Sequence, residues 1–348
     1  MSKRKLLKLV NLGHVMDWDD PRLYTLVALR RRGVPPGAII SFVGSLGVST
    51  APTNIQVSRF EHAVRQYLEN TVPRLFLVLN PLKVTIENLS DDYVTFIDKP
   101  LHPKVPELGT SVIPFTRTIY IDADDFRLQD SKDYFRLAPG KSVGLFQAPY
   151  PITYASHKTD DNGKVIEVIA RLENDGKTKK PKTFIHWVAE HAPSGSPVRV
   201  DEVRIFHRLF KSRDPAAQPN YLDDIAPNSL EVVKGAVIEV GFWPLAKKAY
   251  VEARKESKER MKKAESAVVS SPEEVSHDDT PRATEGQLIG NEVVRFQALR
   301  VGYFALDKDA ELGCFSKGED VVPMASPGDK LVLNRIVSLK EDSGKAVS

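Results

Sequence analysis

Apolar residues recur three and four positions apart through the first 72 residues, which is the spacing of an amphipathic helix. One stripe predicts a helix that Asp20 caps, with Pro21 at its first position, and that Gly33 ends. A second stripe predicts a helix over residues 35–47. The front of the chain is therefore expected to be helical.

A third helix is predicted to start at Ser58 and to end before Pro73. Ser58 and Glu61 have the spacing of a capping box, in which each side chain binds a free amide of the first turn. Together the three helices would form a short connector ahead of the rest of the chain.

Beyond Pro73 the pattern changes to short runs of β-branched and aromatic residues, separated by Asn, Asp, Pro and Gly. Evenly spaced short strands without long helices between them are typical of barrels, so the predicted fold class is α+β and mostly β. The runs lie at residues 75–79, 84–86, 93–97 and 118–121, and Asp161-Asn162-Gly163 predicts a hairpin between 152–154 and 165–169.

A charged segment interrupts the strands. Residues 247–263 hold eight Lys or Arg and three Glu, and the pairs Glu256/Arg260 and Glu259/Lys263 have helical spacing. Residues 266–288 are rich in Ser, Glu, Asp and Pro, which predicts disorder, and the residues from 341 predict a frayed tail. We favour a solvated surface insertion over residues 247–288, with an RNA-contacting arm as the alternative.

Composition and charge narrow the class of protein. The chain has 348 residues and a net charge of +3, but residues 1–72 hold ten Lys or Arg against five Asp or Glu. No apolar run approaches the ~20 residues of a membrane span, and no signal-peptide pattern is present. Cys314 is the single cysteine and predicts a small buried apolar residue in a reducing compartment. We therefore expect a cytoplasmic protein without membrane contact.

Met1-Ser2-Lys3-Arg4 is followed by Trp18-Asp19-Asp20-Pro21-Arg22-Leu23 and by the basic residues 29–33, a series that resembles class I aminoacyl-tRNA synthetases of the glutamine and glutamate subgroup. Later segments resemble glutaminyl-tRNA synthetases in the same order along the chain, and residues 30–36 and 184–188 fit the glutamine branch better. These segments are Asn70-Thr71-Val72-Pro73-Arg74, Val112-Ile113-Pro114-Phe115, residues 133–141, residues 181–188, Arg208-Leu209-Phe210, Gly302-Tyr303-Phe304 and residues 333–337.

The resemblance is to the C-terminal part of a eukaryote-type cytosolic enzyme, and it implies the end of a catalytic region and two anticodon-binding β-barrels. Residues 1–72 would be the catalytic end with the helical connector, 73–188 the first barrel part, 189–340 the second with the insertion, and 341–348 a tail. The barrels also resemble the fold of a ribosomal protein that binds 5S RNA.

The family joins glutamine to tRNA(Gln) with ATP and Mg²⁺, and these would be its substrates and ion. In the family a Ser-Lys loop closes over ATP, so the resemblance assigns Met1, Ser2, Lys3 and Arg4 to this loop and gives Lys3 the stabilisation of the leaving pyrophosphate. The nucleotide-binding Rossmann half would lie before Met1. We therefore expect this chain alone to bind no ATP or Mg²⁺ and to charge no tRNA, unless a separate N-terminal catalytic half is added.

Anticodon bases are read by hydrogen bonds and by stacking on aromatic or guanidinium planes. Carried over by motif, Arg74, Gln297 and Arg300 would surround the middle anticodon base, and Arg136 would read the third base. For any one arginine alone, a surface salt bridge would be the better interpretation.

The chain also departs from the family pattern. Gly144 and Phe146 stand where bacterial members carry arginines for the first anticodon base, and Phe135 replaces a lysine beside Arg136. Reading of the first base is therefore open: Phe146 could stack on either pyrimidine or belong to the barrel core.

Other candidate sites are weaker. His186 and His191 near Glu190 predict structural histidines, because a metal site would need a further ligand on the same face. Asp122, Asp124 and Asp125 predict a solvated turn, and Ser2 beside Lys3 is no nucleophile pair. We predict no metal site. A non-catalytic RNA-binding protein and a truncated gene product remain alternatives to the ligase.

Overall fold

The computed structural model describes residues 2–48, 54–174, 181–269, 289–313, 325–326 and 328–340, with the backbone alone over 263–269. Met1, Cys314, most of the segment predicted to be disordered and the predicted tail lie outside these residues. The α-helices are α1 (Lys3–Asn11), α2 (Leu26–Arg32), α3 (Pro36–Leu46), α4 (Val57–Glu69) and α5 (Phe242–Val269). Short 3-10 turns are η1 (Pro106–Leu108), η2 (Ala123–Asp125), η3 (Ala192–Ser194), η4 (Pro215–Ala217) and η5 (Asn291–Val293).

The predicted helices are present, but two of their starts were wrong. Thr25, not Asp20, caps α2 by accepting a hydrogen bond from the Ala28 amide at 3.1 Å. Asp20 is unable to cap because it is buried and its carboxylate accepts hydrogen bonds from the side chain of Arg22, 2.7 and 2.9 Å away. Gly33 does end α2, at φ +99°, where a Cβ would lie 2.3 Å from that of Ala305.

The predicted capping box of α4 was also wrong. The helix starts at Val57, so Ser58 already lies inside its first turn, and Gln56 at the cap position makes no side-chain cap bond. Glu61 instead lies 3.6 Å from the guanidinium of Arg32, which ties α4 to α2. As predicted, the helix ends before Pro73.

The strands form a six-stranded, a seven-stranded, a three-stranded and a two-stranded sheet. The six-stranded sheet has the order β1 (Arg74–Leu75), β16 (Arg295–Ala298), β17 (Gly302–Leu306), β18 (Val332–Ser338), β13 (Glu202–Phe206), β14 (Leu230–Val233). The seven-stranded sheet has the order β10 (Phe184–Ile185), β7 (Ser142–Leu145), β8 (Ile152–Thr159), β9 (Val165–Leu172), β3 (Pro81–Ile86), β6 (Thr118–Asp122), β11 (Val188–Ala189). The smaller sheets are β12 (Val198–Val200), β15 (Ala236–Ile238), β2 (Leu77–Val78), and β4 (Val94–Pro100) with β5 (Thr110–Thr116).

Each large sheet encloses its own core, which confirms the expectation of a mostly β fold with two barrels after a helical region. Phe296 and Phe304 lie in the core of the six-stranded sheet, and Phe115 and Trp187 in that of the seven-stranded sheet. The run predicted as one strand at 75–79 is split between β1 and β2, which belong to different sheets. We call the barrel that contains the six-stranded sheet the proximal barrel and the other the distal barrel.

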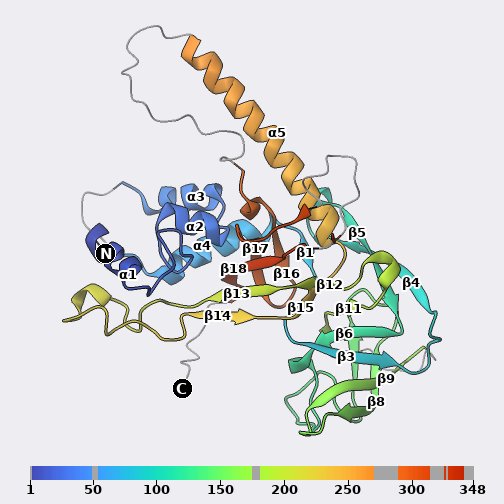
Figure 1. Ribbon diagram of the computed structural model, residues 1–348. Coiled ribbons are helices and arrows are strands. Elements are labelled where there is room, and N and C mark those ends of the chain that lie inside the picture. Colours follow the sequence, from blue (N-terminus) through green and yellow to red (C-terminus); the bar gives the residue numbers. More distant parts are fainter. Residues whose placement is uncertain are drawn as a thin grey trace.

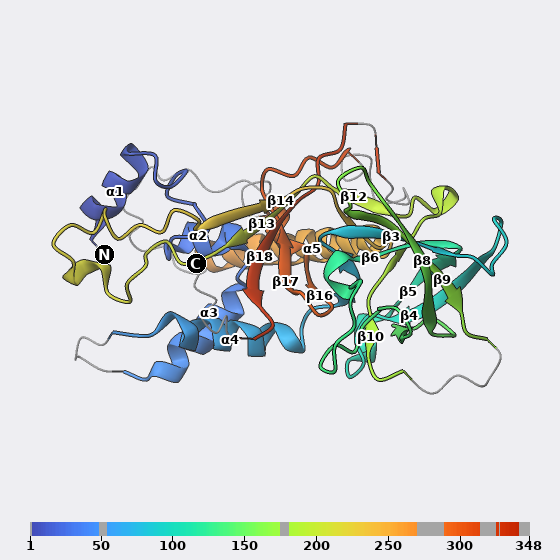
Figure 2. The ribbon, with the colours of Figure 1, turned by 90° about the horizontal axis from the view of Figure 1, so that it is seen from below.

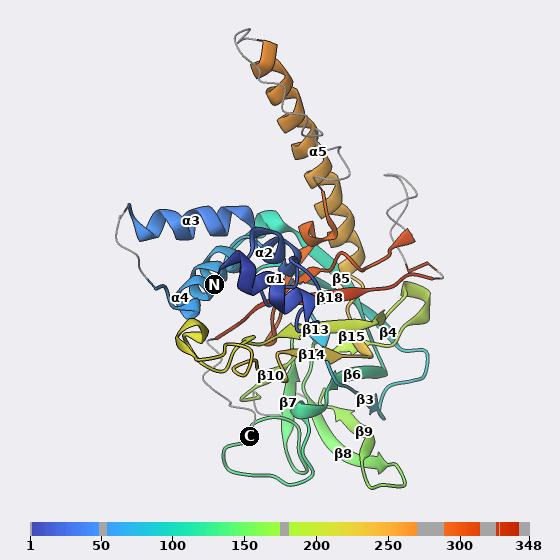
Figure 3. The same ribbon diagram turned by 60° about the vertical axis from the view of Figure 1, so that its left-hand side comes forward.

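The helices α1 to α4 lie at one end of the molecule and the distal barrel at the other, with the proximal barrel between them (Figure 1, Figure 2). Leu68 of α4 packs with Tyr303 and Ile336, which fixes the helical region on the proximal barrel. The helix α5 starts in the proximal core with Phe242 and then projects outward (Figure 1, Figure 3). No helix of the described residues has the length and apolar character needed to span a membrane.

Candidate anticodon-binding site

The central contact of the site joins the two barrels. Arg300 stands in the turn between β16 and β17 with φ +68°, a left-handed backbone conformation that non-glycine residues rarely adopt. Its guanidinium donates two hydrogen bonds of 2.7 Å to the carboxylate of Asp125 in η2 of the distal barrel. This bidentate geometry is the strong form of an arginine–carboxylate pair.

Arg136 shares the same carboxylate. Its Nη1 lies 3.0 Å from Asp125 Oδ1 and donates to the carbonyl of Asp124 at 3.2 Å. The Asp125 side chain is only 2% exposed, whereas those of Arg300 and Arg136 are 23% and 40% exposed. The prediction of a solvated turn was therefore wrong for Asp125: two guanidinium groups neutralise its charge and permit its burial.

His186 lies behind Arg300. Its Nδ1 is 3.3 Å from Arg300 Nη1, and the residue is 3% exposed. Burial, together with the positive charge of Arg300, lowers the pKa of His186 to about 4. The ring is therefore neutral at pH 7 and accepts from the guanidinium, as a structural histidine would.

Arg74 and Gln297 are direct neighbours across β1 and β16. Among the described residues, Arg74 Nε and Gln297 Oε1 are buried and make no hydrogen bond. Buried polar atoms are nearly always paired, so one free donor beside one free acceptor indicates a place where a ligand supplies the partners. Lys99 donates to the Arg74 carbonyl at 2.7 Å and lies 3.2 Å from buried Glu239, which fixes the backbone of β1.

The four residues predicted to bind RNA thus fall into two linked pairs near the junction of the two barrels. Arg74 is aligned with Gln297, which precedes Arg300 by three residues, and Arg300 is joined to Arg136 through Asp125. A second unpaired cation, Arg65 of α4, lies close by: it is 8% exposed, and its Nη1 and Nη2 have no partner among the described residues. Arg65 and Arg74 both lie near Tyr303. Burial raises the pKa of Tyr303, and the positive charges of Arg74 and Arg65 offset part of that rise.

Gly144 and Phe146, which stand where bacterial relatives were expected to read the first anticodon base, pack against other residues of the distal barrel. A Cβ at Gly144 would lie 2.4 Å from the ring of Phe184, so this ring leaves no room for a side chain there. Phe146 is partly buried, and its ring centroid lies 5.8 Å from that of Phe184 and 6.4 Å from that of Phe76. These contacts favour the core interpretation over a ring that is free to stack on a base.

Phe135 is 45% exposed, and two ammonium groups lie over its ring. Lys141 is 5.8 Å and Lys182 5.3 Å from the ring centroid. Lys182 and Lys141 therefore place two cations at the ring of Phe135, the residue that precedes Arg136 in the chain. Nothing in the sequence indicated that Asp125 joins the cluster of Arg136 and Arg300, because its partner Arg300 lies 175 residues away in the chain.

The residues assigned to the ATP loop lie elsewhere. Ser2 is the residue before α1, and Lys3 and Arg4 form the first turn of that helix, all three exposed. Met1 is outside the described residues. The helix α1, which begins at Lys3, lies at the end of the molecule opposite the distal barrel (Figure 1, Figure 2). The structure therefore does not bring Lys3 near Arg136 and Arg300.

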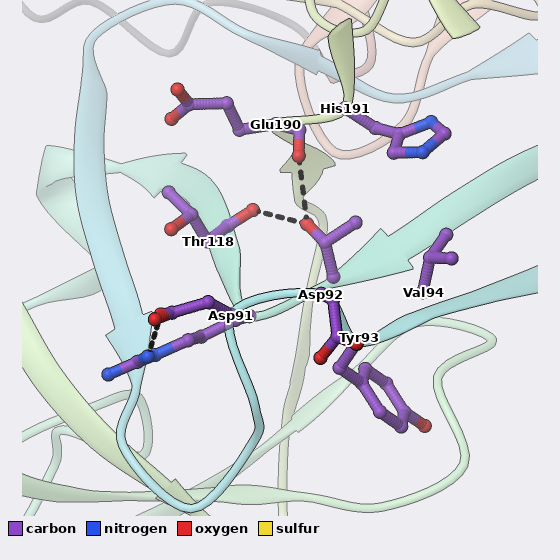
Figure 4. Close-up of a pocket in the computed structure, with 9 residues that line it drawn as sticks. Asp91, Asp92, Tyr93, Val94, Thr118, Glu190 and His191 are labelled. Carbon is purple, nitrogen blue, oxygen red and sulfur yellow. Dashed lines mark hydrogen bonds and ion pairs between the residues drawn. The ribbon is translucent and has the colours of Figure 1, made fainter. Parts of the chain in front are cut away.

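An open hollow of about 310 Å³ lies at the base of β4 and β5 (Figure 4). Its lining includes Asp91, Asp92 and Glu190, and Arg117 is paired with Asp91. The Thr116 hydroxyl lies 2.7 and 3.1 Å from the carbonyls of Thr118 and Glu190. None of the residues predicted to bind RNA is among those that line this hollow.

Comparison with known proteins agrees with this arrangement. The family described as tRNA synthetases class I (E and Q) matches through its catalytic domain at residues 1–70 and through two anti-codon binding domains at residues 72–173 and 184–251. The chain belongs to this family.

Its relatives carry the glutamine specificity in their names. A probable glutamine–tRNA ligase of Schizosaccharomyces pombe is 45% identical over 347 residues, and a glutamine–tRNA ligase of Saccharomyces cerevisiae is 42% identical over 363 residues. A cytoplasmic glutamine–tRNA ligase of Arabidopsis thaliana is 39% identical over 351 residues. Each match covers 99% of this chain but only 36 to 39% of the relative, so the chain spans well under half of their length.

Proposed function

We propose that this chain supplies anticodon recognition to a cytoplasmic glutamine–tRNA ligase whose partner is tRNA(Gln). The observation that carries the proposal is the cluster in which Asp125 joins Arg136 to Arg300, together with the buried, unpaired atoms Arg74 Nε and Gln297 Oε1. Guanidinium groups with free donors and an amide with a free acceptor are the groups that read unstacked bases.

The assignment to individual bases follows the family resemblance. Arg74, Gln297 and Arg300 would surround the middle anticodon base, and Arg136 would read the third. Arg136 is the most exposed of the three residues in the Asp125 cluster, so it can meet RNA without losing its carboxylate partner. The barrels would thus be the recognition domains, over residues 73–188 and 189–340.

The same proposal assigns the helical region to the catalytic part of the ligase. Residues 1–70 match a catalytic-domain model, and α2 and α3 expose large apolar side chains: Leu26 is 72%, Ile40 73% and Val43 58% exposed. Large exposed apolar side chains on neighbouring helices are typical of a protein interface when they cluster, so we infer that further catalytic protein packs here. ATP, Mg²⁺ and glutamine would bind in that part, with Lys3 beside the pyrophosphate.

The direct test uses a single arginine. Replacing Arg136 by alanine should weaken binding of the cognate anticodon stem-loop by roughly 1 to 3 kcal/mol, the usual worth of a base-reading arginine. The loss should be smaller for a stem-loop altered at the third anticodon base, because that contact is already missing. Fluorescence anisotropy with both RNAs measures the difference.

Arg171→Ala is the matched control, since Arg171 is an exposed arginine of the same barrel whose ion pair in the described part of the chain is with exposed Glu87. It should change neither affinity. Equal losses for the two RNAs with Arg136→Ala would show that Arg136 is a phosphate contact, and the assignment to the third base would be wrong.

A further inference from the structure

One buried carboxylate holds two arginines that the proposed function assigns to two neighbouring anticodon bases. Asp125 contacts Arg300 through both of its oxygens at 2.7 Å and Arg136 through Oδ1 at 3.0 Å. Oδ1 is therefore shared between the two guanidinium groups. Any shift of one arginine toward its base alters the field and the hydrogen bond that orient the other.

Both arginines keep donors for a ligand while they remain paired. Among the described residues, Arg136 bonds through Nη1 alone, which leaves its Nε and Nη2 without a hydrogen-bond partner. Arg300 uses Nη1 and Nη2 for Asp125 and His186, and its Nε makes no hydrogen bond in the described part of the chain. An arginine can bind a carboxylate with one edge and a base with another, because its five N–H groups lie in one plane.

Asp125 itself is too deeply placed to meet RNA. Its side chain is 2% exposed and faces the two guanidinium groups, and its charge helps to raise the pKa of Tyr134 to about 12, mainly an effect of burial. A buried carboxylate is stable only while its charged partners stay in place, because losing one of them leaves part of its charge uncompensated in the interior. The carboxylate therefore acts on the RNA only through the arginines.

We propose that Asp125 is a positioning residue that couples the reading of the middle and the third anticodon base. This inference rests on the proposed function. It adds that the two bases are read as a unit, so that losing one correct base weakens discrimination at the other.

The test replaces Asp125 by asparagine, which keeps the shape and removes the charge. Anticodon stem-loops are prepared with the cognate sequence, with one substitution at each anticodon position, and with the middle and third bases changed together. In the wild-type chain the double change should depart from the product of the two single penalties by about threefold or more, as expected for coupled groups. In Asp125→Asn the single penalties at both positions should shrink at least threefold, and the departure from the product should disappear.

Asp124→Asn is the matched control, because it removes the same charge from the adjacent exposed side chain of η2. Asp124→Asn should leave the affinity penalties at all three anticodon positions unchanged. The penalty for a substitution at the first anticodon base should stay the same in every variant. A role in folding alone would lower the affinity for every stem-loop by the same factor and leave their ratios intact, which would overturn the inference.

Two further outcomes are separated by the same experiment. If the wild-type chain binds all stem-loops equally, the proposed function fails; if it discriminates but Asp125→Asn keeps the full penalties at both bases, the coupling fails alone. Should Asp125→Asn not fold, Asp125→Glu keeps the charge and displaces the carboxylate by one methylene. It should then reduce the penalties at both positions together, and a reduction at one position only would contradict the proposal.

Discussion

Two arginines of the proposed site, Arg300 and Arg74, differ in how their guanidinium groups are paired with protein groups. Arg300 has both of its terminal guanidinium nitrogens bound by protein groups: Nη1 and Nη2 donate to Asp125, and Nη1 also donates to His186. Within the part of the chain that the structure describes, the Arg74 side chain has no such partner, and its Nε lies buried beside the equally unpaired Oε1 of Gln297. The difference indicates that Arg300 contributes to the stability of the fold, whereas Arg74 would contribute chiefly to the proposed binding of RNA.

The largest effect should follow from Arg300→Ala. Removing this arginine leaves the buried carboxylate of Asp125 with one ion-pair partner among the described residues, Arg136, and breaking a buried pair costs about 3 kcal/mol. Urea unfolding should show this loss of stability, whereas the exposed control Arg171→Ala should stay within about 0.5 kcal/mol. A loss below about 1 kcal/mol would mean that the pair does not stabilise the fold.

The pH dependence of stability should reveal His186. Its pKa is about 4 in the folded protein and 6.5 is its ordinary value, so between these pH values the unfolded state binds more protons. Stability is therefore present above pH 6.5 and is lost as the pH falls toward 4, by about 3 kcal/mol. The free energy of unfolding should fall by this amount more in the wild-type chain than in His186→Gln. Parallel pH profiles would show that His186 is not the titrating group.

Arg74→Ala should produce the reverse of the Arg300 result. Because Arg74 has an unpaired buried atom, its removal should change the free energy of unfolding by no more than about 0.5 kcal/mol. Binding of the cognate stem-loop should nevertheless weaken by roughly 1 to 3 kcal/mol. A stable variant that binds normally would contradict the interpretation of the open polar atoms, and an unstable one would remove the contrast with Arg300.

The smallest effect is expected for α5. Glu256 pairs with Arg260 at 3.5 Å on its exposed surface, as the sequence predicted, and the helix projects away from both barrels (Figure 3). Replacing Arg254, Lys255, Lys258 and Lys262 by glutamine should leave discrimination between cognate and noncognate RNA unchanged. Each phosphate contact lowers log affinity by roughly 0.7 to 0.9 for a tenfold rise in salt. A salt slope shallower by two or more contacts would identify α5 as an RNA-binding arm.

Motif and order along the chain were enough to assign Arg74, Arg136, Gln297 and Arg300 to RNA, and this assignment stays a prediction. Asp125 could not be recognised in the same way, because its partner Arg300 lies 175 residues away and only the docking of the two barrels brings them together. The carboxylate therefore looked like part of an exposed acidic turn.

The helix starts and one strand failed for a similar reason. Asp20 is of a residue type that often caps helices, but its carboxylate accepts hydrogen bonds from the side chain of Arg22 instead. The run at 75–79 has the pattern of one strand, yet Leu75 and Leu77 join different sheets. Local patterns predict which elements form, while long-range packing decides where each begins and which neighbour it takes.

The most direct test of the whole account is the affinity of the wild-type chain for four anticodon stem-loops: the tRNA(Gln) sequence and one substitution at each anticodon position. Base-reading contacts are worth about 1 to 3 kcal/mol each, so substitutions at the middle and third bases should weaken binding by about tenfold or more. The first base should matter less, because the Phe184 ring fills the space at Gly144 and Phe146 packs against the distal core. Equal affinities for all four RNAs would contradict the claim that this junction of the two barrels reads the anticodon.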